Sequence, residues 1–123
     1  MDNHEIIVDL SYLKEVASGN VEFMVEMIDI FLDQTPGYLV NLKEAIENKN
    51  WQKIAESAHK IKPTLGFMGI ESARETMAEI ELNARKQENF ENIVLKHNQM
   101  QEVFKTIFVK LEEKKQELLA QDN

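Results

Sequence analysis

Apolar side chains recur every three or four residues along nearly the whole chain of 123 residues. This spacing puts them on one face of an α-helix, because an α-helix has 3.6 residues per turn. No segment shows the strict apolar–polar alternation that predicts a β-strand. A chain of this length builds one hydrophobic core. The pattern therefore predicts a single all-α domain over residues 1–123.

Capping residues divide the N-terminal part of this pattern into short helices. Asp9 and Asn20 are of the types that accept hydrogen bonds from free backbone N–H groups at helix starts. They predict one or two short helices within residues 9–33. Thr35 followed by Pro36 predicts a new helix start, because proline suits the first helical position.

The rest of the chain predicts an antiparallel four-helix bundle over about residues 36–119. Asn50 is placed to cap the second bundle helix, which should stop near Gly66. The connections between the four helical patterns are short, and short connections make neighbouring helices antiparallel. The tail over residues 112–123 is mostly polar, and we expect it to fray.

The composition and charge of the chain exclude several kinds of partner and site. The formal net charge of −8 would repel nucleic acids and anionic lipids, so we expect a protein partner. With no cysteine, the chain has no disulfide, thiolate nucleophile or sulfur-ligated zinc site. No apolar run approaches the roughly 20 residues of a membrane span, and the N-terminus does not look like a signal peptide. We expect a cytoplasmic monomer that binds neither nucleic acid nor membrane.

The segment 21–32 carries more apolar surface than one core face needs. Its polar neighbours fall on a narrow strip: Glu22, Glu26, Asp29 and Asp33. The apolar residues then cover on the order of 220° of the helix circumference, at about 100° per residue. Two interpretations remain open: a helix wedged deeply among others, or a helix with one edge free to dock another protein.

One helical stretch places a histidine on the flank of its helix. His59 lies beside the buried stripe, in a row with Lys62 one turn later and Gly66 two turns later. We therefore expect the imidazole to be at least partly exposed, near an ammonium group and near a position without a side chain. Pro63 lacks the N–H that would bond to the carbonyl of His59, so the helix should bend or loosen there.

Three chemical uses of this stretch are unfavourable. Ser57 points about 200° away from His59 around the helix, so it cannot act as a nucleophile activated by that histidine. Glu56 and His59 have the E-x-x-H spacing of di-iron bundles, but the second pair that such a site needs is missing at His97. The residues GFMG at 66–69 match the loop of RNA-binding KH domains, yet the chain is acidic and shows no strands.

Phosphoryl transfer fits the stretch best. An exposed imidazole is partly unprotonated at neutral pH and can attack a reactive acyl phosphate without a separate base. The reaction depends mainly on positioning and on stabilising charge. A histidine on a rigid bundle helix, a nearby lysine and open space supply these needs. The four glycines form no ATP-binding loop, so the chain cannot make its own phosphoryl donor.

At these residues the sequence resembles the histidine-containing phosphotransfer (HPt) domains of multistep two-component signalling. The family pattern is A-H-x-hydrophobic-K on a helix, followed by small residues and a glycine ten residues after the histidine. Residues 58–62, AHKIK, and Gly69 match this pattern without an insertion. Many members have glycine four residues after the histidine, where this chain has Pro63. The motif match is specific, and the helix layout extends the resemblance over most of the chain.

The resemblance implies a phosphocarrier. His59 would accept a phosphoryl group from the phosphoaspartate of a receiver domain and pass it to another receiver, while Lys62 would help to neutralise the phosphoryl oxygens. The partners would be response-regulator receiver domains and a hybrid sensor kinase. The chain would need no cofactor, because the Mg²⁺ of the reaction would belong to the receiver. We expect the partner to contact residues around the histidine: Lys60, Pro63, Gly66, Phe67, Arg74, Ala78 and Arg85.

Other polar residues have simpler interpretations. One row on the fifth predicted helix contains Arg74, Ala78, Glu81 and Arg85. The arginines could hold the phosphoryl group or the acidic receiver pocket if the row borders His59, although a solvated flank explains the row more simply. His97 lies among apolar residues and is predicted to be structural, and His4 lies in the N-terminal tail.

One function from a different class remains open. The chain could be a helical adaptor that binds a receiver or another signalling protein and never carries phosphate, with His59 as an ordinary surface residue. Both functions predict the same bundle. Only phosphoryl transfer to His59 separates them.

Overall fold

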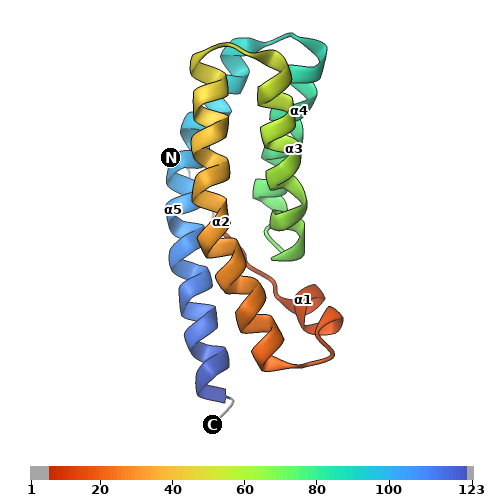
Figure 1. The fold of residues 1–123 in the computed structure, drawn as a ribbon, viewed down its shortest axis with the longest axis vertical. Helices are drawn as coiled ribbons and strands as arrows, with labels where there is room; N and C mark the ends of the chain where they lie inside the picture. Colours follow the sequence, from red (N-terminus) through yellow and green to blue (C-terminus); the bar gives the residue numbers. More distant parts are fainter. Residues whose placement is uncertain (1–5, 122–123) are drawn as a thin grey trace.

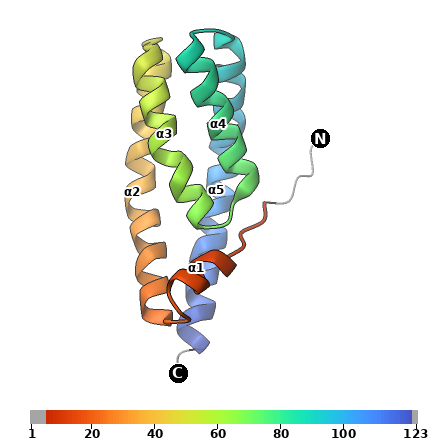
Figure 2. The ribbon, with the colours of Figure 1, turned by 90° about the vertical axis from the view of Figure 1, so that its right-hand side faces the viewer.

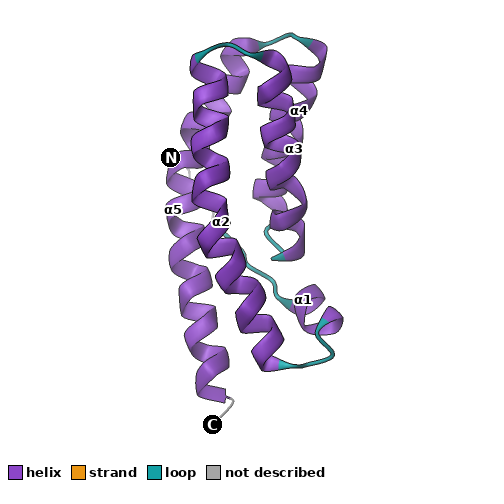
Figure 3. Cartoon of the chain, in the orientation of Figure 1, coloured by secondary structure: helices purple, strands orange, loops and turns teal. Residues whose placement is uncertain are grey.

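Residues 6–121 are described by a computed structural model, in which they form five helices and no strand (Figures 1 and 3). The helices are α1 (Ser11–Val16), α2 (Val21–Glu47), α3 (Trp51–Phe67), α4 (Glu71–Lys86) and α5 (Phe90–Gln121). The all-α class predicted from the apolar period is confirmed.

Helices α2 to α5 form an antiparallel four-helix bundle, and the short helix α1 lies across one end of it (Figure 2). Each bundle helix packs against two others: α3 against α2 and α4, and α5 against α2 and α4. Apolar side chains from all five helices fill one core. Its fully buried members include Leu13, Ile28, Leu42, Ile54, Ile61, Met77, Ile80, Ile93 and Ile107. Removing this apolar surface from water is the main force that holds the helices together.

The structure corrects the predicted helix boundary at residues 33–36. α2 continues through Pro36 without interruption, so α1 is the one short N-terminal helix among the described residues, and the bundle begins at Val21. A proline inside a helix costs about 3 kcal/mol and bends the helix, and Figure 1 shows α2 changing direction about halfway along its length. Packing on both sides offsets this cost, because Phe31, Thr35 and Leu42 are all buried on the same face of α2.

The C-terminal tail is also more ordered than predicted. α5 extends to Gln121, through most of the segment expected to fray. Leu111 is fully buried, and Leu118 packs against the core. The ammonium of Lys115 lies 2.7 Å from a carboxylate oxygen of Asp29. The last turns of α5 therefore pack along the N-terminal half of α2.

The predicted caps at Asn20 and Asn50 are confirmed. The side-chain oxygen of Asn20 accepts a hydrogen bond from the N–H of Phe23, at 2.8 Å. That of Asn50 accepts one from the N–H of Lys53, at 3.1 Å. Asp9 lies one residue before the N-cap position of α1, and its carboxylate accepts hydrogen bonds from the N–H and hydroxyl of Ser11 instead.

The turn between α3 and α4 is held against the N-terminal segment at Gly69. Its backbone has φ of +67°, a left-handed conformation that side-chain-bearing residues rarely adopt. A Cβ atom there would lie 1.7 Å from the carbonyl oxygen of Asp9. The carbonyl of Gly69 in turn accepts a hydrogen bond from the N–H of Asp9, at 3.2 Å. The glycine ten residues after His59 thus has a structural role at this contact.

Candidate functional site

His59 lies on α3 with its side chain directed largely to solvent. The side chain is 63% exposed, as the sequence predicted. The preceding residue, Ala58, is completely buried, as are Ile54 and Ile61 on the same core face of α3. The imidazole is therefore carried by a helix whose adjacent face is anchored in the core.

One nitrogen of this ring contacts a carboxylate on the neighbouring helix. Nδ1 of His59 lies 3.0 Å from Oε2 of Glu81. The two residues are 22 positions apart, and the antiparallel packing of α3 against α4 brings them together. The side chain of Glu81 is only 9% exposed. Glu81 therefore fixes the ring from the core side while the rest of the imidazole faces outward.

Two cationic side chains contact the same carboxylate. Nζ of Lys62 lies 2.8 Å from Oε1 of Glu81, in an ion pair rather than a well-aligned hydrogen bond. The guanidinium of Arg85 donates from Nε to Oε2 at 2.8 Å, and its terminal nitrogen lies 2.7 Å from the same oxygen. We call His59, Lys62, Glu81 and Arg85 the Glu81 cluster.

The balance of these effects keeps Glu81 ionised. Burial by itself raises the pKa of this carboxyl. The contacts that Lys62 and Arg85 make with the carboxylate, together with the charge of Lys62 and a smaller contribution from His59, outweigh burial and lower the pKa below its ordinary value. At neutral pH the cluster therefore contains a carboxylate that accepts hydrogen bonds and two permanent cations next to an exposed imidazole.

The other residues predicted to contact a partner lie on both sides of α3. Lys60 lies on the α2 side, with its ammonium 5.5 Å from the ring centre of Tyr38. Arg74 pairs with Glu71 and lies against Gly66, where a Cβ atom would be 3.2 Å from the Cδ of Arg74. The open approach expected at Gly66 is thus bordered by an arginine side chain. Ala78 is half-buried on α4.

An apolar cleft of about 300 Å³ lies between α2 and α3, lined by Pro63 and Phe67. On the α2 side it is lined by Met27 and by Ile30, which is exposed. Pro63 and Phe67 follow His59 by four and eight residues, so the cleft begins about one helical turn beyond the histidine. The segment 21–32 therefore leaves one apolar edge accessible. Docking of a protein there stays a prediction.

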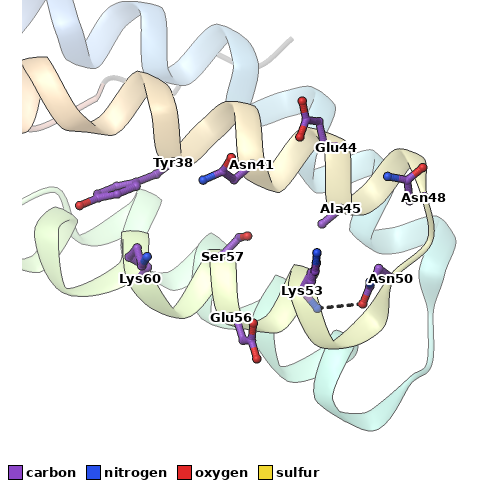
Figure 4. Close-up of a pocket in the computed structure, with 10 residues that line it drawn as sticks. All are labelled: Tyr38, Asn41, Glu44, Ala45, Asn48, Asn50, Lys53, Glu56, Ser57 and Lys60. Carbon is purple, nitrogen blue, oxygen red and sulfur yellow. Dashed lines mark hydrogen bonds between the residues drawn. The ribbon is translucent and has the colours of Figure 1, made fainter.

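A second cleft between α2 and α3 is polar (Figure 4). It has a volume of about 350 Å³ and is lined by side chains of both charges, including Lys53 and Lys60, Glu44 and Glu56. Figure 4 shows Asn41 and Ser57 facing the space between the two helices. His59 does not line this cleft. The candidate phosphoryl acceptor is thus on an open surface, where a partner can supply the enclosing pocket.

His97 is buried, as predicted, with only 8% of its surface exposed on α5. Burial, and then the charge of Lys43, lowers its pKa below the ordinary value. Among residues 6–121 no group of three or more His, Asp and Glu side chains is placed to hold a metal ion. Nor is any helix in this range long and apolar enough to cross a membrane. His4 lies outside the described residues.

Glu81 is the residue of this site that sequence reasoning missed. The spacing of Arg74, Ala78, Glu81 and Arg85 placed it in the right row, but its contact with His59 depends on how α3 and α4 pack. A signal was nevertheless present. An acidic residue four positions before Arg85 is placed to form an ion pair with it along the helix. When such a pair lies on a helix that packs against the helix of His59, it predicts a polar cluster there.

Comparison with known proteins identifies the family. The Hpt domain family matches residues 26–119. The crystal structure of histidine-containing phosphotransfer protein B (HptB) from Pseudomonas aeruginosa PAO1 has the same fold, with a TM-score of 0.79 and 20% sequence identity over 89% of this chain and 95% of that chain. No curated protein sequence matched. Because the family match covers well over half of the chain, and an exposed histidine on the third helix carries its motif, the chain belongs to the Hpt domain family.

Proposed function

We propose that this chain is a histidine phosphocarrier that accepts a phosphoryl group on His59 and passes it on within a phosphorelay. The observation that supports this most is the exposed imidazole of His59, fixed on its core side by Glu81 and accompanied by Lys62 and Arg85. An exposed imidazole is a nucleophile at neutral pH, and nearby cations offset the charge of the phosphoryl oxygens.

The transfer would take place between His59 and a phosphoaspartate of a receiver domain. A ring nitrogen attacks phosphorus, the bond from phosphorus to the aspartate oxygen breaks, and the aspartate leaves as a carboxylate. Passing the group to a second receiver reverses these changes. Lys62 is half-buried at the base of the ring and can turn toward the phosphoryl oxygens. Its ammonium would stabilise charge in both directions.

The receiver would cover two neighbouring surfaces of this chain. Its acidic pocket would face the cations around His59, and an apolar element would enter the cleft beside Pro63 and Phe67. The Mg²⁺ of the reaction would belong to the receiver, so this chain would need no cofactor. It would act as a monomer and would have no ATP site. A hybrid sensor kinase would supply the phosphoryl group to the relay.

The deciding experiment mixes the protein with a receiver domain carrying labelled phosphoaspartate. We expect acid-labile, base-stable label to appear on the native chain and to be absent from His59→Gln. His97→Gln is a matched control, because it removes a buried histidine of the same chain. If receivers from the same cell bind the native chain but transfer no label, the chain is an adaptor and not a phosphocarrier.

A further inference from the structure

A third cleft lies between α2 and α5, on the face of the bundle opposite the Glu81 cluster. The two helices run side by side there (Figure 1). The volume of the cleft is about 310 Å³, at the lower end of the range of small-molecule sites, about 300–1,000 Å³. Its apolar lining includes Leu39 and Val40 of α2, Met77 of α4, and Met100 and Phe104 of α5. We call this space the α2–α5 cleft.

Buried apolar side chains form the floor of the α2–α5 cleft. Met77 is fully buried, and Met100 and Phe104 are almost so, whereas Val40 is exposed at the mouth. Met77 comes from α4, which packs against α5, so the cleft reaches toward the core of the bundle. Water against such a surface is easily displaced by an apolar group. The floor therefore suits an aliphatic chain.

Two lysines, one from each helix, are the charged residues that line this cleft. Lys43 and Lys105 are both exposed, and no acidic residue of the described chain lines the cleft with them. This is unexpected in a chain with 22 acidic and 14 basic residues. Among residues 6–121 Lys43 forms no ion pair. Lys105 contacts Glu102 at 3.1 Å, but exposed pairs of this kind contribute little. Both ammonium groups are therefore available to an anion at the mouth.

This arrangement of charge and apolar surface favours one class of ligand. A stable protein interface involves about 20–30 residues on each side, whereas ten residues line the α2–α5 cleft. A small molecule fits this space better than a protein. Its chain would lie on the apolar floor, and its anionic group would lie at the lysines. A neutral or cationic head group would leave both lysines without a partner.

We propose that the α2–α5 cleft binds a single-chain aliphatic anion of the medium-chain fatty acid class. Its chain would contact Met77, Met100 and Phe104, and its carboxylate would lie between Lys43 and Lys105. Such a ligand contacts both α2 and α5 and stabilises the folded chain increasingly as its concentration rises above the Kd. The site does not include His59. This inference therefore goes beyond the proposed function, and a failure of either one leaves the other in place.

The first experiment titrates the full chain with octanoate, below its micelle concentration, and follows methyl and backbone NMR signals. We expect saturable shifts at Val40, Met77 and Met100 and none at His59. Octanoate should bind about 15-fold more tightly than hexanoate, because each of two more buried methylenes contributes roughly 0.8 kcal/mol. The absence of saturable binding, or shifts centred on another part of the chain, would overturn the proposal.

A second experiment asks whether the lysines recognise the anionic group. Octanol has the same chain as octanoate but no charge. Lys43→Ala should weaken octanoate binding about fivefold and leave octanol binding unchanged. Lys86→Ala is the matched control, because it removes an exposed lysine outside the cleft. Equal octanoate affinities in the two variants would reject the assigned anion site.

Val40→Trp tests the cleft itself, because a larger side chain at the mouth fills the space. We expect octanoate affinity to fall more than about tenfold. Val40 is exposed, and circular dichroism verifies that the variant folds. If it does not fold, the chain-length series on the native protein decides the question. A native protein that dimerises on concentration, with shifts at Val40 and Met100 that octanoate does not reverse, would assign the cleft to a second copy of the chain and overturn the proposal.

Discussion

His59 and His97 are the same side chain on two helices of one bundle, in opposite surroundings. His59 is 63% exposed, and its Nδ1 contacts a carboxylate. His97 is 92% buried on α5, and burial together with the charge of Lys43 lowers its pKa. Each has a lysine nearby, but Lys62 shares an anionic partner with its histidine, whereas Lys43 opposes protonation of its own.

This difference separates a histidine that a partner protein can reach from one that serves packing. The position of His59 beside the core face of α3 gives access, and Glu81 gives orientation. His97 lacks this access, because only 8% of its surface is exposed. Access and a fixed ring orientation, rather than the residue type, should decide which histidine carries phosphate.

The most direct test of the difference between the two histidines is to replace each of them with glutamine. His59→Gln should lower the label acquired from a phosphorylated receiver by more than roughly 100-fold, because the nucleophile is lost. His97→Gln should stay within about twofold of the native protein. Gel electrophoresis of reactions with labelled receiver measures both. Label on His97 in the His59→Gln protein would show that burial does not protect the second histidine.

The two lysines give the next largest contrast. Lys62→Ala should slow transfer to His59 about tenfold, because a charge-assisted contact to the phosphoryl group is worth roughly 1.5–3 kcal/mol. Lys43→Ala should leave the rate unchanged, since Lys43 lies near His97 on the cleft between α2 and α5. Rapid-quench kinetics measures these rates. Equal rates for native and Lys62→Ala proteins would remove Lys62 from the mechanism.

The smallest effect concerns stability in acid. The folded-state pKa of His97 is lowered, so the unfolded chain takes up a proton near pH 6.5 that the folded protein binds only at lower pH. Stability should therefore fall as the pH drops below about 6.5. His97→Gln should show a smaller loss between pH 7.5 and 5.5 in urea unfolding. Its near neighbours, Lys43, Glu47 and Asn98, are unchanged in this test. An identical acid loss in both proteins would show that His97 titrates normally.

Much of the fold follows from local rules. The caps at Asn20 and Asn50, and the burial of His97, depend on neighbours within a few residues and could be predicted. Pro36 was misjudged because its local preference favours a helix start. Phe31 and Leu42, which precede and follow Pro36, are both buried on the same face of α2, and their burial outweighs that preference.

The site could be predicted only in part, for a related reason. The exposure of His59 follows from its place on the helix, but the contact with Glu81 depends on the register between α3 and α4. No periodicity within either helix fixes that register. The helical tail of α5 was missed in the same way, because its order comes from contacts with α2, such as Lys115 with Asp29.

Pro63 has a consequence for how another protein can recognise the surface around His59. It lies within α3 four residues after His59, so the peptide oxygen of His59 lacks the N–H that would normally occupy it. His59 therefore carries a main-chain acceptor that residue 63 cannot satisfy. We expect that a partner with a lysine or a free amide at the matching height would bind this oxygen, whether or not the imidazole carries phosphate.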